Sequence, residues 1–169
     1  KKQRINAESA RVPFIIKYPA LFGKEGKKTD FLINSMDILP TMMGMSGLEV
    51  PNISDGENIT SVLLGERADT REAALITCVQ PFGQWSRARG GREYRGLITK
   101  KYTYAHDLNG EWMLFDNDAD PYQMNNLKGD ESLQSVVQKL DDILSKELSR
   151  LDDEFLTGPT YLEKCDIEV

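Results

Sequence analysis

Side chains that could bind an anion and a sugar gather around Gly90-Gly91. These candidate binding residues are Gln84, Trp85, Arg87, Arg89, Arg92 and Arg95. Guanidinium groups match the oxygens of sulfate, phosphate or carboxylate in a bidentate geometry, and a tryptophan face can stack on a sugar ring. The stretch therefore suits one small anionic group. A solvated loop whose arginines pair with the acidic C-terminal half explains the same composition.

The single histidine, His106, limits other catalytic chemistries. Any Ser/His relay or His-pair metal site would have to share it. The phosphate-binding and dinucleotide-binding glycine motifs, the zinc-protease motif and the nucleophile elbow are all missing from the sequence. His106 is either a ligand contact or an ordinary residue at a strand end.

Three aspartates at alternating positions, Asp116, Asp118 and Asp120, resemble a calcium-binding loop. The glycine and the later glutamate of such a loop are missing. The sequence therefore favours a solvated turn closed by Pro121.

Charge and composition exclude several classes of protein. The 169 residues are 40% hydrophobic and 28% charged, which is typical of a globular protein of one domain or two small ones. The net charge is 0 over residues 1–86, +5 over 87–106 and −11 over 107–169. This acidic chain does not suit a nucleic-acid partner. Its longest uncharged stretch, Ile38–Leu48, is far shorter than the roughly 20 apolar residues of a membrane span.

The two cysteines, Cys78 and Cys165, fit neither a zinc module nor a disulfide framework. Two buried free thiols are expected, and a single disulfide stays open as an alternative.

The first half of the chain has the pattern of an α/β protein. Val12–Ile16 is predicted to be a buried strand, and a second apolar run covers Asp30–Ile33. A mostly buried helix should begin at Ser35 or Asp37 and end at Gly47, and a short helix is expected near Ile59–Leu64.

The second half predicts an antiparallel meander covered by one helix. Four strand candidates are joined by turn residues, and they span 73–79, 94–99, 102–106 and 112–115. Apolar residues recur at helical spacing over 131–155, with Asp130 as the N-cap. The predicted domains are 1–68 and 69–169.

Several segments, in order, resemble type I sulfatases. They are Lys2 with Glu8–Ile16, Asp37–Thr41 with Gly47–Pro51, Asp55-Gly56 with Leu63–Gly65, and Arg95–Tyr104 followed by Trp112–Asp116 and Asp120–Leu127. Each segment alone is weak, but together they cover residues 2 to 127.

The resemblance implies an α/β fold of the alkaline-phosphatase-like superfamily, with α+β character in the C-terminal part. This chain would be the C-terminal portion, ending in a four-stranded antiparallel sheet packed on a long helix. The implied activity is hydrolysis of sulfate esters by a formylglycine beside a calcium ion. The Cys/Ser-x-Pro-x-Arg motif that yields formylglycine does not occur here. The nucleophile and the calcium ligands are therefore expected in a preceding N-terminal part, and this chain alone should be inactive.

Lys2 matches the family lysine that binds a sulfate oxygen. A lysine ammonium can stabilise negative charge that builds on sulfate oxygens. The family's C-terminal subdomain commonly reaches the rim of the substrate pocket, which implies that the loop with Gln84, Trp85 and the arginines contacts a sulfated carbohydrate. Asn6, Ala7 and Ile98 depart from the usual family residues, and these departures bear on the identity of the substrate rather than on the fold.

The resemblance also implies partners and a location. The expected partners are a sulfated small molecule or glycan and the N-terminal part of the same enzyme, with neither nucleic acid nor membrane. Family analogy places such enzymes in a periplasm, a lysosome or outside the cell. The alternatives are a phosphodiesterase or phosphonate hydrolase of the same superfamily, and a non-catalytic module that binds anions or glycans.

Overall fold

The structure is a computed structural model that describes residues 3–52 and 54–166. The chain divides into two compact units. Pro13–Ala74 form one, and the residues up to Val12 together with Leu75 onward form the other. The division at residue 68 stays a prediction about the domains of the parent protein.

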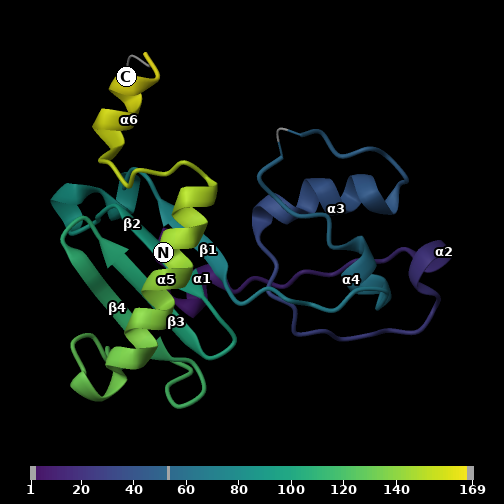
Figure 1. Ribbon diagram of the computed structural model, residues 1–169, viewed down its shortest axis with the longest axis horizontal. Coiled ribbons are helices and arrows are strands. Elements are labelled where there is room, and N and C mark those ends of the chain that lie inside the picture. The colour runs from purple at the N-terminus through teal and green to yellow at the C-terminus, as the bar shows by residue number, and fades with distance from the viewer. Residues whose placement is uncertain (1–2, 53, 167–169) are drawn as a thin grey trace. The chain divides into compact units, whose positions relative to one another are not determined.

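Four strands form one antiparallel sheet in the order β1-β2-β3-β4 (Figure 1). They are β1 (Ala74–Cys78), β2 (Tyr94–Ile98), β3 (Tyr102–Asp107) and β4 (Gly110–Asp116). Each segment contains β-branched or aromatic residues, and turn residues separate the segments, so each strand pairs with the next along the chain. The predicted meander is confirmed.

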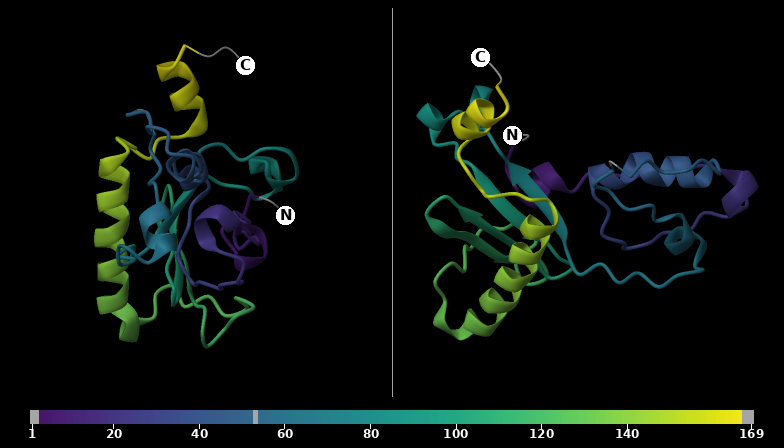
Figure 2. Two further views of the ribbon diagram at one scale, coloured as in Figure 1. Left: turned by 90° about the vertical axis from the view of Figure 1, so that its right-hand side faces the viewer. Right: turned by 45° about the horizontal axis from the view of Figure 1, so that its top comes forward.

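One long helix, α5 (Gln134–Arg150), lies along one face of this sheet (Figures 1 and 2). A 3₁₀ turn, Glu131–Leu133, leads into α5. The Asp130 carboxylate caps this turn by accepting a hydrogen bond from the Ser132 amide (2.9 Å). The helix ends before the predicted residue 155, because Asp152 and Phe155 adopt left-handed φ angles of 52° and 54°. A further helix, α6 (Gly158–Lys164), follows.

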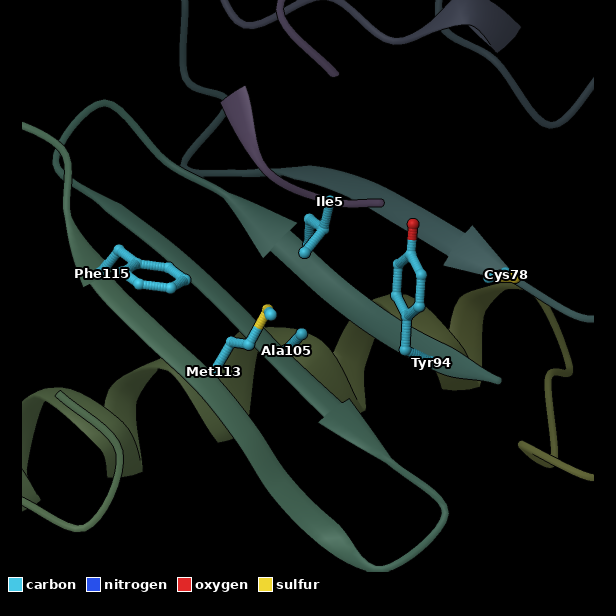
Figure 3. Packing of buried hydrophobic residues seen from close by; sticks show 6 residues of the cluster. All are labelled: Ile5, Cys78, Tyr94, Ala105, Met113 and Phe115. Carbon is cyan, nitrogen blue, oxygen red and sulfur yellow. The ribbon is translucent and has the colours of Figure 1, made fainter. Parts of the chain in front are cut away.

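The opposite face of the sheet carries a cluster of buried apolar residues (Figure 3). Its buried members are Ile5, Cys78, Tyr94, Ala105, Met113 and Phe115. Ile5 comes from the N-terminal segment, just before the short helix α1 (Ala7–Ala10), and is fully buried. Residues at the beginning of the chain therefore help to form the core of the sheet.

The other unit contains three short helices and a buried carboxylate, Asp37. They are α2 (Pro19–Phe22), α3 (Ile38–Met45) and α4 (Thr60–Leu64). Asp37 accepts hydrogen bonds from the Asn34 and Glu57 amides (2.6 and 2.8 Å) and pairs with Arg71. Burial alone would raise the pKa of Asp37, but the Arg71 guanidinium and these amides outweigh burial and lower it. A helix forms at the predicted position, and Gly47 follows it with a φ of 69°. The expectation that this helix is mostly buried is wrong for this structure, because Leu39 and Met42 are 63% and 56% exposed.

The predicted strand at Val12–Ile16 is wrong for this structure. The segment is extended but pairs with no strand of the described residues, and the exposed fractions of Val12 and Ile15 are 74% and 88%. Asp30–Ile33 likewise forms no strand. An apolar run becomes a strand only when a neighbouring strand completes its backbone hydrogen bonds.

Both cysteines are free thiols, but only Cys78 is buried, whereas Cys165 is exposed. The prediction of two buried thiols is thus half right. No helix in residues 3–52 or 54–166 is long and apolar enough to cross a membrane.

Candidate functional site

The candidate binding loop connects β1 to β2 and contains two 3₁₀ turns, Gly83–Trp85 and Arg87–Arg89. Gly90 ends the second turn with a φ of 81°. A Cβ on Gly91 would lie 1.6 Å from the Trp85 carbonyl oxygen. These glycines are therefore needed to close the loop on itself, which the sequence alone did not reveal.

Trp85 anchors the loop to the face of the sheet that α5 does not cover. Its ring packs near Trp112 at a centroid distance of 6.5 Å, and the Arg4 guanidinium lies 4.7 Å from the Trp85 centroid. The Arg92 guanidinium lies 4.9 Å from the Trp112 ring. Arg4, Trp85, Trp112 and Arg92 thus form a chain of cation–π and aromatic contacts that joins the N-terminal segment to the loop.

Two arginines of the loop pair with carboxylates of the sheet region. Arg87 pairs with the buried Glu93, and Arg92 Nη1 lies 2.6 Å from Asp107 Oδ2. Burial would raise the pKa of Glu93, but hydrogen bonds from Arg87 and the Gly158 amide lower it. The Arg87 and Arg92 side chains remain 49% and 44% exposed, so each can also meet a ligand.

Arg95 requires a correction, because its side chain is fully buried. Its guanidinium makes a bidentate pair with Asp153, with an Nη2–Oδ1 distance of 3.0 Å, and lies 4.7 Å from the Phe155 ring centroid. Arg95 Nη1 also donates to the carbonyl oxygens of Cys78 and Tyr94. Arg95 therefore binds protein groups inside the fold rather than presenting its charge to a ligand.

His106 lies apart from the loop, on the face of the sheet that α5 covers. Its Nε2 lies 2.7 Å from the Tyr104 hydroxyl and 3.0 Å from Asp141 Oδ1 on α5. The Tyr104 hydroxyl donates to the same Asp141 oxygen (2.6 Å). Arg95 and His106 are partners across β2 and β3, so the sequence-predicted residues divide between two faces of the sheet.

Gln84 and Arg89 are the loop residues most open to a ligand. Both are exposed, and neither side chain has a hydrogen-bond or ion-pair partner among residues 3–52 and 54–166. Gln84, Arg87, Arg89 and Arg92 therefore remain as the polar groups of the loop that could contact an anionic sugar.

Lys2 lies outside the described residues, but the residues that follow it are held firmly against the sheet. The Gln3 side chain exchanges two hydrogen bonds with the backbone of Phe82, and the Tyr94 hydroxyl donates to the Gln3 carbonyl oxygen. Gln3 and Tyr94 are 91 positions apart in the sequence, and sequence reasoning missed this contact.

The described residues offer no cluster of three or more His, Cys, Asp or Glu side chains that could hold a metal ion. Asp116, one of the three spaced aspartates, accepts hydrogen bonds from the amides of Asp118 and Ala119, as in a turn. Burial, together with the nearby Glu93 charge, raises the pKa of the Cys78 thiol. The donor set thus does not fit the calcium site or the nucleophile that the family resemblance implies, and no metal-dependent step is assigned to this chain.

Comparison with known proteins identifies the family. The family model described as N-sulphoglucosamine sulphohydrolase, C-terminal, matches residues 1–150. The chain belongs to this family. This match confirms the resemblance of the sequence motifs to the C-terminal part of sulfatases with the alkaline-phosphatase-like fold.

Individual relatives agree. The chain is 39% identical over 167 residues to an ulvan-active sulfatase of Formosa agariphila, a match that covers 97% of this chain and 32% of the relative. It is 30% identical to an endo-4-O-sulfatase of Bacteroides thetaiotaomicron, covering 94% of this chain and 32% of the relative. The chain thus spans about a third of the length of these curated relatives.

Solved structures show the same fold. One protein, solved in complex with its substrate D-glucosamine-2-N,6-O-disulfate, superposes with a TM-score of 0.61 at 28% identity and covers 70% of this chain and 24% of that protein. A phosphonate monoester hydrolase of Agrobacterium radiobacter superposes with a TM-score of 0.57 at 22% identity, over 72% of this chain and 26% of that enzyme. The second likeness is evidence for the fold alone.

Proposed function

We propose that this chain is the C-terminal part of an enzyme that hydrolyses sulfate esters of sulfated carbohydrates. The observation that carries the proposal is the match of the sulfatase C-terminal family over residues 1–150, together with 39% identity to a sulfatase active on ulvan. A formylglycine nucleophile and a calcium ion would be supplied by the N-terminal part of the same enzyme. The hydrated formylglycine would provide the attacking oxygen, and the calcium ion would neutralise charge on the sulfate.

Two regions of this chain contribute to that reaction in our account. Lys2 donates to a sulfate oxygen and stabilises the charge that develops on it. Gln84 and Arg89, with Arg87 and Arg92 beside them, contact the sugar or a second acidic group of the substrate, because guanidinium and amide donors match hydroxyl and sulfate oxygens. The exposed positions of Gln84 and Arg89 support this role.

Assays of the full-length enzyme test the proposal. Sulfated oligosaccharides, an aryl sulfate, a phosphonate monoester and a phosphodiester are offered in parallel, and the released sulfate or phosphate product is measured. We expect the highest kcat/KM for a sulfated oligosaccharide. Faster turnover of the phosphonate or the diester would instead assign the protein to the hydrolases that share its fold. Glycan binding without any turnover would indicate a non-catalytic module.

The location of the enzyme is part of the same proposal. Sulfated polysaccharides are too large to diffuse freely into a cell, so an enzyme that acts on them is expected in a periplasm, a lysosome or the extracellular space. Fractionation of the source cells, followed by immunodetection of the full-length protein, tests this expectation.

A further inference from the structure

Gln3, which directly follows Lys2 in the chain, is fixed by three hydrogen bonds. Gln3 Nε2 donates to the Phe82 carbonyl oxygen (3.1 Å), and Gln3 Oε1 accepts from the Phe82 amide (3.2 Å). The Tyr94 hydroxyl donates to the Gln3 carbonyl oxygen (2.8 Å). The side chain of Gln3 is thereby held by the β1–β2 loop, and its backbone by Tyr94 on β2.

Ile5 and Ala7 make further contacts between the N-terminal segment and the rest of this unit. Ile5 is fully buried against Gly96, where a Cβ would come within 2.3 Å of Ile5 Cδ1. The Ala7 amide donates to Gln123 Oε1 (2.8 Å). Gln3, Ile5 and Ala7 are thus each held in place, Gln3 by the β1–β2 loop and β2, Ile5 by the face of the sheet, and Ala7 by Gln123 in the segment after β4 (Figure 3 shows Ile5 above β2).

The Tyr94 hydroxyl has no competing role in the described fold. Tyr94 is 2% exposed, and its ring packs against Trp112 at a centroid distance of 5.5 Å. Burial raises the pKa of its phenol far above the ordinary value, so the hydroxyl stays a hydrogen-bond donor at every physiological pH. The one hydrogen bond it donates among the described residues goes to Gln3.

We propose that Gln3 and Tyr94 are positioning residues that hold Lys2 at the sulfate group. The inference rests on the proposed function, in which Lys2 stabilises charge on a sulfate oxygen. Consecutive Cα atoms are about 3.8 Å apart, so a fixed Gln3 restricts where the Lys2 ammonium can reach. Electrostatic stabilisation of a transition state depends on such preorganised placement. The C-terminal sheet thereby acts on the chemical step as well as on substrate recognition.

The test compares two buried tyrosines in the full-length enzyme. Tyr94→Phe removes the hydrogen bond to Gln3, and the control Tyr104→Phe removes the hydrogen bond to Asp141 on the other face of the sheet. We expect Tyr94→Phe to lower kcat about tenfold for both an aryl sulfate and a sulfated oligosaccharide, because small misplacements of a catalytic group are costly. KM should change little. Tyr104→Phe should keep the kcat of the wild type, while both variants lose a few degrees of Tm.

A second variant and a double-mutant cycle separate positioning from general destabilisation. Gln3→Ala removes the pairing with Phe82 without touching the apolar cluster, and it should also lower kcat for both substrates. In a Lys2→Ala background, Tyr94→Phe should cost no further kcat, because its effect passes through the lysine.

Three outcomes decide the matter. Unchanged kcat in Tyr94→Phe and Gln3→Ala, in an enzyme that hydrolyses sulfate esters, would overturn the positioning role alone. A further tenfold loss in the Lys2→Ala background would also overturn it. Absence of sulfate release by the wild type would refute the proposed function itself.

Discussion

Arg95 on β2 and Asp153 beyond the end of α5 form a bidentate ion pair whose guanidinium is fully buried. The Tyr161 hydroxyl and the Phe155 amide also donate to Asp153 Oδ1. The pair ties the segment that follows α5 to the second strand of the sheet. A residue that the sequence suggests for ligand binding therefore holds a helix and a sheet together.

Replacing Arg95 by alanine should destabilise the protein strongly. The change leaves Asp153 without its cation in a mostly buried position, and breaking such a pair costs about 3–5 kcal/mol in the free energy of unfolding. Urea denaturation of the full-length protein measures the loss. The matched control is Arg89→Ala, which should stay within about 0.5 kcal/mol of wild type because the exposed Arg89 side chain has no partner in the described fold. Equal effects of the two substitutions would contradict the buried ion pair.

Stability should fall on acidification as Asp153 becomes protonated. Burial would raise the pKa of Asp153, but the hydrogen bonds from Arg95 and Tyr161 outweigh burial and lower it. A carboxylate whose pKa is lower in the folded state stabilises the fold above its unfolded pKa of about 3.9, and this contribution is lost as pH falls through the folded pKa. Urea unfolding between pH 7 and pH 2.5 should show this decline, and Asp153→Asn should show a shallower one. If the free energy of unfolding fell equally steeply with pH in both proteins, Asp153 would not be the group responsible.

The exposed loop side chains should determine selectivity for sugars. We expect Arg89→Ala to raise KM for a sulfated oligosaccharide about tenfold, the magnitude of one charge-assisted hydrogen bond. KM and kcat for a small aryl sulfate should stay unchanged, since that substrate does not extend to the loop. Gln84→Ala should act in the same direction more weakly. Equal losses on both substrates would reject a role of the loop in sugar recognition.

Any side chain at Gly96 is expected to destabilise the fold. A Cβ at this position would lie 2.3 Å from Ile5 Cδ1 and 2.6 Å from the Tyr104 carbonyl oxygen. Gly96→Ala should therefore destabilise the protein by about 1–3 kcal/mol, as overpacking does. Gly26→Ala is the control, because a Cβ at Gly26 meets no atom within 4 Å. Thermal unfolding of the two variants measures the difference, and an unchanged Tm in Gly96→Ala would show that Ile5 does not pack there.

The secondary structure of the sheet and its helix could be predicted because the signals are local. β-branched and aromatic residues, with turn residues such as Leu108–Gly110 between them, predict the strands, and the helical spacing of apolar residues after Asp130 predicts α5. The strand prediction at Val12–Ile16 is wrong because a strand needs a neighbouring strand to pair with, and local residue propensity does not show whether one is present. The end of α5 was also missed, because the left-handed residues Asp152 and Phe155 are neither glycine nor asparagine.

The candidate site was only partly predictable. The composition of the loop identifies its arginines as candidate binding residues, but it does not show which guanidinium group is buried. The strand pattern does indicate that Arg95 points inward. Successive residues of β2 point to opposite faces of the sheet, so Arg95 lies on the same face as Leu97, which is buried. Its partner Asp153 lies 58 positions away, and the contact of Tyr94 with Gln3 spans 91 positions. Such long-range pairs follow from the packing of the whole sheet.

The most direct test of the account is the rate of sulfate release by the full-length enzyme and by its Lys2→Ala variant under saturating substrate. Loss of one donor to a developing oxyanion typically lowers kcat by roughly 10² to 10³, and we expect a loss of this size for a sulfated oligosaccharide and for an aryl sulfate alike. The KM of each substrate should change much less. Sulfate release at the wild-type rate by Lys2→Ala would contradict the account.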